Sequence, residues 1–161
     1  MIQRIQSIFL LVVVVSMLVA MFFPIWEKEN QETKEKTTLT FLKMEYQKEG
    51  KVQNTAGTQA TYYLLILAGV IIFSATYSIF RFDSRLMQMK IGLFNSLILS
   101  IILVVSVYLI SYYGETSFAK PLNGDYFIGF YLPIVAIIAN LAANRFIRKD
   151  EKLVRSADRM R

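Results

Sequence analysis

Four long apolar blocks without a charged residue constrain the fold of this chain more than any other feature. They occupy residues 5–26, 62–80, 91–113 and 126–144. An α-helix rises about 1.5 Å per residue, so roughly 20 apolar residues are needed to cross a hydrocarbon layer of about 30 Å. One such block could be a buried helix of a soluble protein, but four of them in 161 residues leave too little polar chain to cover them. The sequence therefore predicts an integral membrane protein.

We expect an all-α membrane protein, in which the whole chain, 1–161, forms one four-helix transmembrane bundle. The helices are predicted at residues 5–26, 62–80, 91–113 and 126–146. The connections between them are an outer loop at 27–61, an inner loop at 81–90 and an outer loop at 114–125, and a basic amphipathic tail follows at 147–161.

The first block has an alternative interpretation as a cleaved signal peptide, with Arg4 as its basic start. We favour a retained helix, because the apolar stretch is longer than the usual 7–15 residues and Ala20 offers only a weak cleavage site. Cleavage would leave three helices in the same orientation.

The distribution of Lys and Arg predicts which side of the membrane each connection faces. Eleven of the eighteen lie before the first block, in the 81–90 connection or after the fourth block. Cytoplasmic segments carry an excess of these residues, so both termini are predicted to be cytoplasmic. Aromatic residues crowd the opposite ends of the blocks, among them Trp26, Tyr62, Tyr113 and Tyr131. They support the same orientation, because such rings favour the membrane–water interface.

The outer loop at 27–61 changes character along its length. Its first part, EKENQETKEK, is highly charged and is expected to be solvated. The following TTLTFLKMEYQKEGKVQ carries strand-forming residues around a turn near Gly50, which predicts a small extracytoplasmic β-hairpin between the first two helices. A short surface helix is the alternative. An isolated hairpin is marginally stable in water, so it would need the membrane surface, the third loop or a partner to pack against.

The tail RFIRKDEKLVRSADRMR continues from the fourth helix and repeats apolar residues at helical spacing, which predicts an amphipathic helix on lipid or on a partner. Its candidate contacts to anionic lipid headgroups or to a partner are Arg145, Arg148, Lys149, Lys152 and Arg155. Each basic residue near an anionic surface contributes about 1 kcal/mol of attraction. The alternative, which we favour, is that this charge only fixes topology, since basic tails follow from the positive-inside rule alone.

Several kinds of chemistry are disfavoured by composition. The chain has no Cys and no His, and therefore no disulfide, thiolate, imidazole base or usual zinc or haem ligand. No charged residue lies inside an apolar block, whereas proton- and cation-coupled transporters usually carry one. We expect no enzyme activity, no cofactor and no metal site. The net charge of +6 lies beside apolar blocks, which indicates lipid rather than nucleic acid as the anionic partner.

Polar residues within the blocks gather towards the predicted cytoplasmic ends. The candidate polar layer consists of Ser74, Ser78, Asn95, Ser96, Asn140 and Asn144. This layer could be a shallow vestibule that binds a headgroup or a small ligand, or it could hydrogen-bond the helices to one another. We favour the second interpretation, because Ser, Thr and Asn are common at helix contacts in membranes.

Small residues recur at four-residue spacing at Gly92, Ser96 and Ser100, and again at Ala136 and Asn140. Such stripes let helix backbones approach closely, so the third and fourth helices are expected to pack together. Pro133 is expected to kink the fourth helix.

The start of the chain, MIQRIQSIFL, and its end, RKDEKLVRSADRMR, resemble a family of small four-pass inner-membrane proteins from Bacteroidetes-type bacteria, described as a domain of unknown function. The resemblance covers essentially the whole chain, and the two terminal motifs are its most specific part. It implies four helices in the bacterial inner membrane, and it implies no activity, cofactor or catalytic residue.

Two hypotheses for function follow. The first is a non-catalytic scaffold, assembly factor or regulatory component, which acts through the outer loop and the basic tail on a membrane-protein partner or a second copy of the chain. The second is an oligomeric carrier or pore for a small or lipidic solute, built around the polar layer. A membrane enzyme ranks third.

Overall fold

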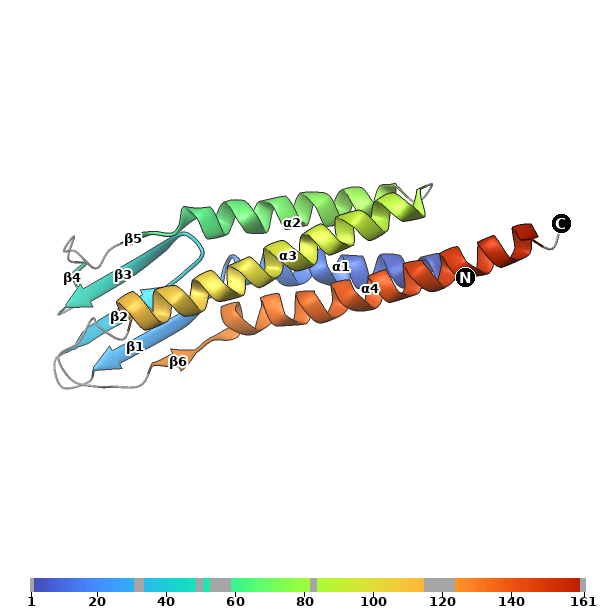
Figure 1. The fold of residues 1–161 in the computed structure, drawn as a ribbon. Helices are drawn as coiled ribbons and strands as arrows, with labels where there is room; N and C mark the ends of the chain where they lie inside the picture. Colours follow the sequence, from blue (N-terminus) through green and yellow to red (C-terminus); the bar gives the residue numbers. More distant parts are fainter. Residues whose placement is uncertain are drawn as a thin grey trace.

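The chain folds into an elongated helical bundle that is closed at one end by a β-sheet (Figure 1). The computed structural model describes residues 2–30, 34–48, 51–52, 59–81, 84–114 and 124–159. Within these ranges the α-helices are α1 (Ile2–Ala20), α2 (Tyr62–Phe80), α3 (Arg85–Leu109) and α4 (Ile128–Arg159). Both termini lie at the end of the bundle opposite the sheet (Figure 1).

Three of these helices are long and apolar enough to cross a membrane. They are α2, α3 with its continuation to Tyr113, and α4 as far as Val154. Among the described residues, α1 provides a shorter apolar stretch, Ile5–Ala20. Length and composition thus indicate a membrane-embedded protein.

Helix α1 ends earlier than the sequence predicted. The uncharged block runs to Trp26, but the helix stops at Ala20. Pro24 disfavours a helical conformation at the residue before it, and the backbone N–H of Ile25 already donates to the carbonyl of Leu39 at 2.8 Å. Trp26 begins a strand and is only 2% exposed, so its assignment to an interfacial aromatic belt was wrong.

Helix α3 begins earlier than predicted, at Arg85 instead of residue 91. Its first turn is closed by the N–H of Gln88, which donates to the carbonyl of Ser84 at 3.1 Å. Leu, Met, Gln and Lys are good helix formers, which explains why the helix extends back over this polar segment. At its other end α3 passes into a π-helical turn, η1 (Ile110–Gly114).

Helix α4 runs without a break through the predicted boundary between membrane helix and tail. It has 32 residues, with Pro133 inside it, and is about 48 Å long at 1.5 Å per residue. Ile147, the first residue of the predicted tail, is 1% exposed and still belongs to the packed bundle. Beyond it the helix projects past the other helices (Figure 1), and the side chains of Leu153 and Val154 are exposed.

The helices pack as a ring in which α1 contacts α4, α4 contacts α3, α3 contacts α2 and α2 contacts α1. The contact of α3 with α4 agrees with their small-residue stripes. The most extensive contact, between α1 and α4, was not predicted, and it includes parallel stacking of Phe9 on Phe146 with ring centroids 5.5 Å apart. The core between the helices is formed by apolar residues that include Val13, Met17 and Leu99.

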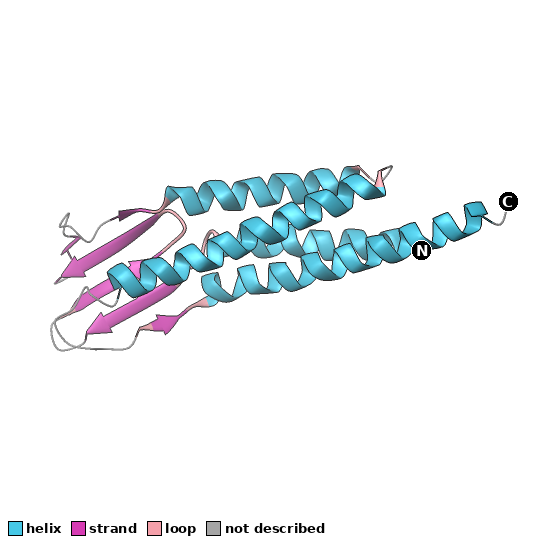
Figure 2. Ribbon diagram, viewed as in Figure 1, coloured by secondary structure: helices cyan, strands magenta, loops and turns pink. Residues whose placement is uncertain are grey.

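The sheet is larger than the hairpin that the sequence predicted. Its strands are β1 (Trp26–Asn30), β2 (Glu35–Leu39), β3 (Lys43–Lys48), β4 (Lys51–Val52), β5 (Gln59–Ala60) and β6 (Asp125–Tyr126). They are antiparallel, in the order β4-β3-β2-β1-β6, and β5 also pairs with β3. All of them lie at the same end of the bundle, beyond α2 and α4 and beside the end of α3 (Figure 2). The fold is therefore a helical bundle with a small antiparallel sheet, not an all-α bundle with one hairpin.

The predicted hairpin is present between β3 and β4, with Lys48 opposite Lys51. Its turn at residues 49–50 lies outside the described residues. The charged segment expected to be solvated instead contributes β1 and the start of β2. On β1 the side chains of Trp26, Lys28 and Asn30 are buried while Glu29 is exposed. This alternation is typical of a strand with one covered face.

The sheet is joined to the helix ends by short hydrogen bonds. The backbone N–H of Phe127 donates to the carbonyl of Ile25 at 3.0 Å, and the backbone N–H of Gly129 donates to the carbonyl of Pro24 at 3.1 Å. At the start of α2, the hydroxyl of Thr61 donates to the carbonyl of Thr40 at 2.9 Å. These bonds fix the sheet on the bundle and hold α1 beside the start of α4.

Candidate functional site

The predicted polar layer lies in the half of the bundle nearer the termini, and parts of it form contacts between helices. The hydroxyl of Ser74 on α2 lies 2.5 Å from Oδ1 of Asn95 on α3. The same hydroxyl also lies 3.1 Å from the carbonyl of Ile71 in its own helix. Asn95 is fully buried. This contact joins α2 to α3.

Asn140 joins α4 to α3. Its side-chain nitrogen donates to the carbonyl oxygen of Gly92 at 2.6 Å and to the hydroxyl oxygen of Ser96 at 2.8 Å. An amide NH₂ group has two hydrogens, so both bonds can form together. Asn140 is fully buried, and these bonds satisfy its nitrogen inside the bundle.

Asn144, one turn further along α4, packs on Gly92. A Cβ atom at position 92 would overlap the side-chain amide of Asn144, so the glycine is what lets α3 approach α4 here. Asn144 is only 6% exposed, and its side-chain nitrogen has no hydrogen-bond partner among the described residues. A buried amide donor without a partner is costly, which marks this position as a place where a further acceptor would be stabilising.

Sequence reasoning missed Gln88, which is 6% exposed and belongs to the same region. Its side-chain nitrogen donates to the backbone carbonyl of Ser78 at 2.8 Å, across the α2–α3 turn. The hydroxyl of Ser78, a predicted member of the layer, is buried without a partner among the described residues. Gln88 had been placed in the inner loop because α3 was predicted to start at residue 91, and an earlier helix start would have put it on the buried face.

An ion-pair cluster beside this region was also not predicted. Nε of Arg85 on α3 lies 3.1 Å from Oδ2 of Asp150 on α4, and another guanidinium nitrogen of Arg85 lies 4.0 Å from Glu151. The contact with Asp150 is a charge pair without hydrogen-bond alignment. The cluster ties the projecting part of α4 to the start of α3.

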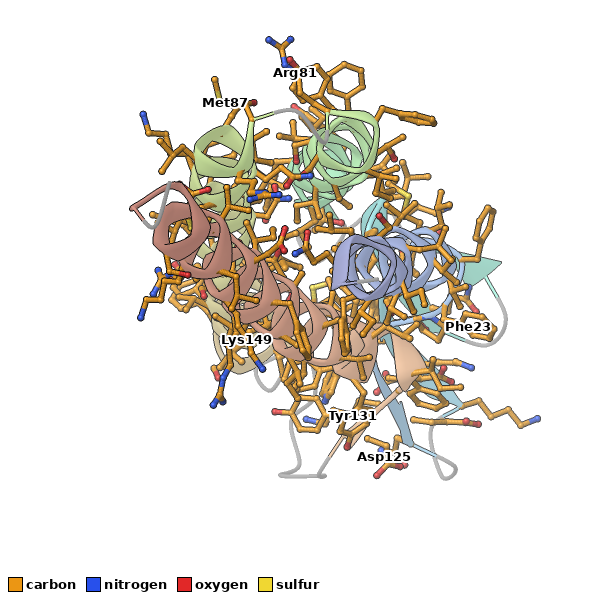
Figure 3. The ribbon with its side chains drawn as sticks, turned by 90° about the vertical axis from the view of Figure 1, so that its right-hand side faces the viewer. Phe23, Arg81, Met87, Asp125, Tyr131 and Lys149 are labelled. Atoms are coloured by element: carbon orange, nitrogen blue, oxygen red, sulfur yellow. The ribbon has the colours of Figure 1, made fainter. Side chains whose placement is uncertain are left out.

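A pocket of about 520 Å³ lies between α3 and α4 at the end of the bundle that carries the termini. Its lining combines apolar, amide and basic side chains: Leu93, Leu141, Asn144, Arg145, Arg148, Lys149 and Lys152. The view along the bundle from this end shows Lys149 at the rim of α4, away from α2 (Figure 3). Four of the five basic residues predicted as headgroup contacts therefore line one pocket, together with one residue of the predicted polar layer.

The structure divides most of the predicted site residues into two groups, and Ser78, whose hydroxyl is buried without a partner among the described residues, belongs to neither. Ser74, Asn95, Ser96 and Asn140 face other helices and take part in hydrogen bonds between them. The second group lines the pocket. Arg155 belongs to α4, but its side chain lies outside the described ones. Leu93 and Leu141 were not predicted as site residues, because exposed leucines carry no signal of their own in an apolar helix.

Within the described residues, no three acidic side chains gather closely enough to hold a metal ion. A search of curated proteins finds no match to this sequence. A family model described as a domain of unknown function, DUF4293, matches residues 2–160, and the chain belongs to that family.

Proposed function

We propose that this protein crosses the bacterial inner membrane four times, with both termini in the cytoplasm. In this arrangement it acts without catalysis, as a scaffold, assembly or regulatory component. Three described helices are long and apolar enough to span a bilayer. The termini lie at one end of the bundle, as an even number of crossings requires (Figure 1).

The shorter apolar stretch of α1 is consistent with a fourth crossing. The whole helix has 19 residues, which corresponds to about 28 Å and approaches the thickness of a hydrocarbon core. It packs against both α4 and α2, each of which is a candidate span. A helix held between two membrane helices along its length lies in the same layer as they do.

The observation that best supports an interaction role is that the chain extends folded structure beyond the helices at both ends of the bundle. At one end, the sheet buries Trp26 and presents charged groups on its other face, where Glu27 forms an ion pair with Lys36. At the other end, α4 projects beyond the bundle with Leu153 and Val154 exposed. Structured elements that extend beyond both ends of the membrane helices are suited to hold partners.

The first experiment tests topology and uses the absence of Cys from the chain. Single cysteines are introduced at two exposed positions, Glu29→Cys on β1 and Ser156→Cys on α4. A membrane-impermeant maleimide added to spheroplasts should label the first variant at once and the second only after permeabilisation. Reversed labelling would overturn the orientation, and immediate labelling of both would overturn the four crossings.

The second experiment tests the interaction role. The tagged protein is recovered from native membranes in mild detergent, and bound proteins are identified by mass spectrometry. A scaffold should recover a partner in stoichiometric amount, and the double variant Leu153→Asp/Val154→Asp should lose it, because the exposed apolar positions of α4 become charged. Asn140→Leu is the matched control, because it changes a buried helix contact and leaves both polar ends intact.

The alternative function is an oligomeric carrier or pore for a small or lipidic solute. The observation in its favour is that several buried polar atoms on the termini side have no hydrogen-bond partner among the described residues, including Nε2 of Gln6, Nδ2 of Asn95 and Oδ1 of Asn140. The two functions also predict opposite effects on the cellular phenotype of the protein. A carrier predicts that Asn140→Leu abolishes this phenotype and that the α4 double variant retains it, and a scaffold predicts the reverse. If both variants behave as the unmodified protein, neither function stands.

A further inference from the structure

The pocket between α3 and α4 concentrates positive charge on one face of a single helix. Arg145 and Lys152 each lie three and four residues from the adjacent pair Arg148 and Lys149, and all four side chains line it. Like charges at these spacings repel one another and destabilise a helix by some tenths of a kcal/mol per pair. An arrangement of this kind is favourable when an anion occupies the space between the charges.

The acids nearest in sequence do not supply that anion. Asp150 and Glu151 face Arg85 on α3 and are absent from the pocket lining. Among the described residues, no carboxylate lies within ion-pair distance of Arg148 or Lys149. The Arg85 cluster therefore directs both carboxylates away and leaves the four cations facing the pocket.

The other side of the pocket is apolar. Leu93 on α3 and Leu141 on α4 line it and are about half exposed, at 54% and 53%. Leu141 lies one to three turns of α4 from the basic residues, towards the middle of the bundle, where exposed side chains face hydrocarbon in a membrane. Between the apolar and basic sides, buried Asn144 has a side-chain N–H group with no partner among the described residues. The lining thus fits a ligand with an acidic end and a hydrocarbon end.

We propose that this pocket binds an anionic phospholipid, with the headgroup phosphate held by the four basic side chains above Asn144, and with the start of an acyl chain on Leu93 and Leu141. Arginine and lysine are the usual partners of phosphate oxygens, and basic pockets beside membrane helices on the cytoplasmic side bind acidic headgroups. A free phosphate would leave both leucines uncovered, which is why the lipid is the better occupant.

The pocket has two features, a concave surface and a buried amide, that a basic tail with a role in topology alone does not need. The positive-inside rule depends on the number of Lys and Arg residues near a helix end and requires no concave surface or buried amide. Here both are present, and Gly92 makes room for Asn144 at the base. The inference rests on the proposed membrane placement and is independent of any protein partner.

The test is native mass spectrometry of the full-length protein, released from nanodiscs that contain equal amounts of phosphatidylglycerol and phosphatidylcholine. The unmodified protein should retain phosphatidylglycerol selectively. In the double variant Arg148→Gln/Lys149→Gln, the affinity for phosphatidylglycerol should fall roughly 25-fold, since each basic residue contributes about fivefold. Both side chains are exposed, so the bundle should remain folded.

Lys90→Gln is the matched control, because Lys90 is an exposed cation at the same end of α3 that does not line the pocket. It should retain phosphatidylglycerol. Arg148→Lys/Lys149→Arg keeps the charge and should retain it as well. Equal loss in Lys90→Gln would overturn the proposal, since attraction would then depend on overall surface charge. Displacement of the lipid by an equimolar amount of inorganic phosphate would also overturn it, because the site would then recognise the free anion alone. Loss of the lipid should not change the recovery of a protein partner from native membranes, so the two proposals can fail separately.

Discussion

The side-chain amide of Asn140 on α4 donates to the backbone carbonyl of Gly92 on α3 across 2.6 Å. A side chain reaches a backbone carbonyl of another helix only where the two helices lie very close together. The small-residue stripe and the polar layer, two independent patterns in the sequence, meet at this contact. Asn144 packs on the same glycine one turn away, and its amide occupies the space that a side chain at position 92 would need.

Replacing Asn140 by leucine should destabilise the bundle modestly. The change removes the bonds to Gly92 and Ser96 while keeping a similar side-chain volume. Side-chain hydrogen bonds in membranes contribute about 0.6 kcal/mol each, so a loss of about 1 kcal/mol is expected. It can be measured by unfolding in mixed micelles of mild detergent and dodecyl sulfate. Ser100→Ala is the control, because that hydroxyl bonds within its own helix and is exposed, and its unfolding should be unchanged. A leucine variant as stable as the parent would mean that these bonds add nothing to the packing.

The junction between α1, the sheet and α4 should be intolerant of a methyl group at Gly129. A Cβ there would lie 2.5 Å from the carbonyl oxygen of Pro24 and 2.7 Å from that of Phe23. These are backbone atoms, so they cannot rotate away, and the N–H of Gly129 would be pulled from Pro24. Overpacking of this kind costs about 1–3 kcal/mol.

Thermal unfolding in detergent should therefore show a clearly lowered midpoint for Gly129→Ala. Gly69→Ala on α2 is the matched control, since a Cβ at that position meets nothing within 4 Å. Alanine is the better helix former, so this control should be as stable as the parent or more stable by up to about 1 kcal/mol. Equal midpoints for the two variants would contradict the close approach at Gly129.

Helix positions were predictable because a bilayer requires long apolar stretches, and α2 occupies the same residues as its apolar block. Helix ends were less predictable. The first helix was predicted to extend through Pro24 to Trp26 because no charged residue interrupts the block, although the backbone forms a strand from Trp26 onwards. Helix α3 was predicted too short, because Arg85 and Lys90 suggested a loop while their segment is helical.

The sheet was largely hidden from sequence reasoning. Side chains of β1 alternate between covered and exposed, but Lys28 occupies one of the covered positions. The alternation therefore does not appear in the sequence as apolar residues alternating with charged ones. Strand β6 has two residues, and it pairs with β1 although α2 and α3 lie between them in the sequence. The pocket was predicted in part: its cations follow from the tail sequence. Its shape depends on Gly92 and on the Arg85 ion pair with α4, which no local pattern reveals.

The Arg85–Asp150 contact should show measurable energetic coupling. Both side chains are largely buried, at 22% and 14% exposed, so solvent screens the pair less than an exposed one. A double-mutant cycle with Arg85→Ala and Asp150→Ala should give a coupling free energy of about 1 kcal/mol, measured as unfolding in mixed micelles. The coupling should weaken at high salt. Additive effects of the two single variants would show that α4 is held to α3 without this pair. A second cycle that combines Arg85→Ala with Lys90→Ala should give a coupling free energy close to zero. Lys90 lies on the same helix and has no ion pair among the described residues.

The chain has one tryptophan, which makes the position of Trp26 directly measurable. An interfacial ring would be exposed to lipid, whereas Trp26 is 2% exposed at the junction of α1 and the sheet, with Gly124 against its indole ring. Its fluorescence in bilayers should therefore be quenched only weakly by brominated lipids and by acrylamide. The comparison is the double variant Trp26→Phe/Phe22→Trp, which moves the only indole to a side chain that is 84% exposed. Brominated lipids should quench that variant strongly. Strong quenching of Trp26 itself would place the ring in the bilayer, and α1 would then extend past Ala20 as the apolar block suggests.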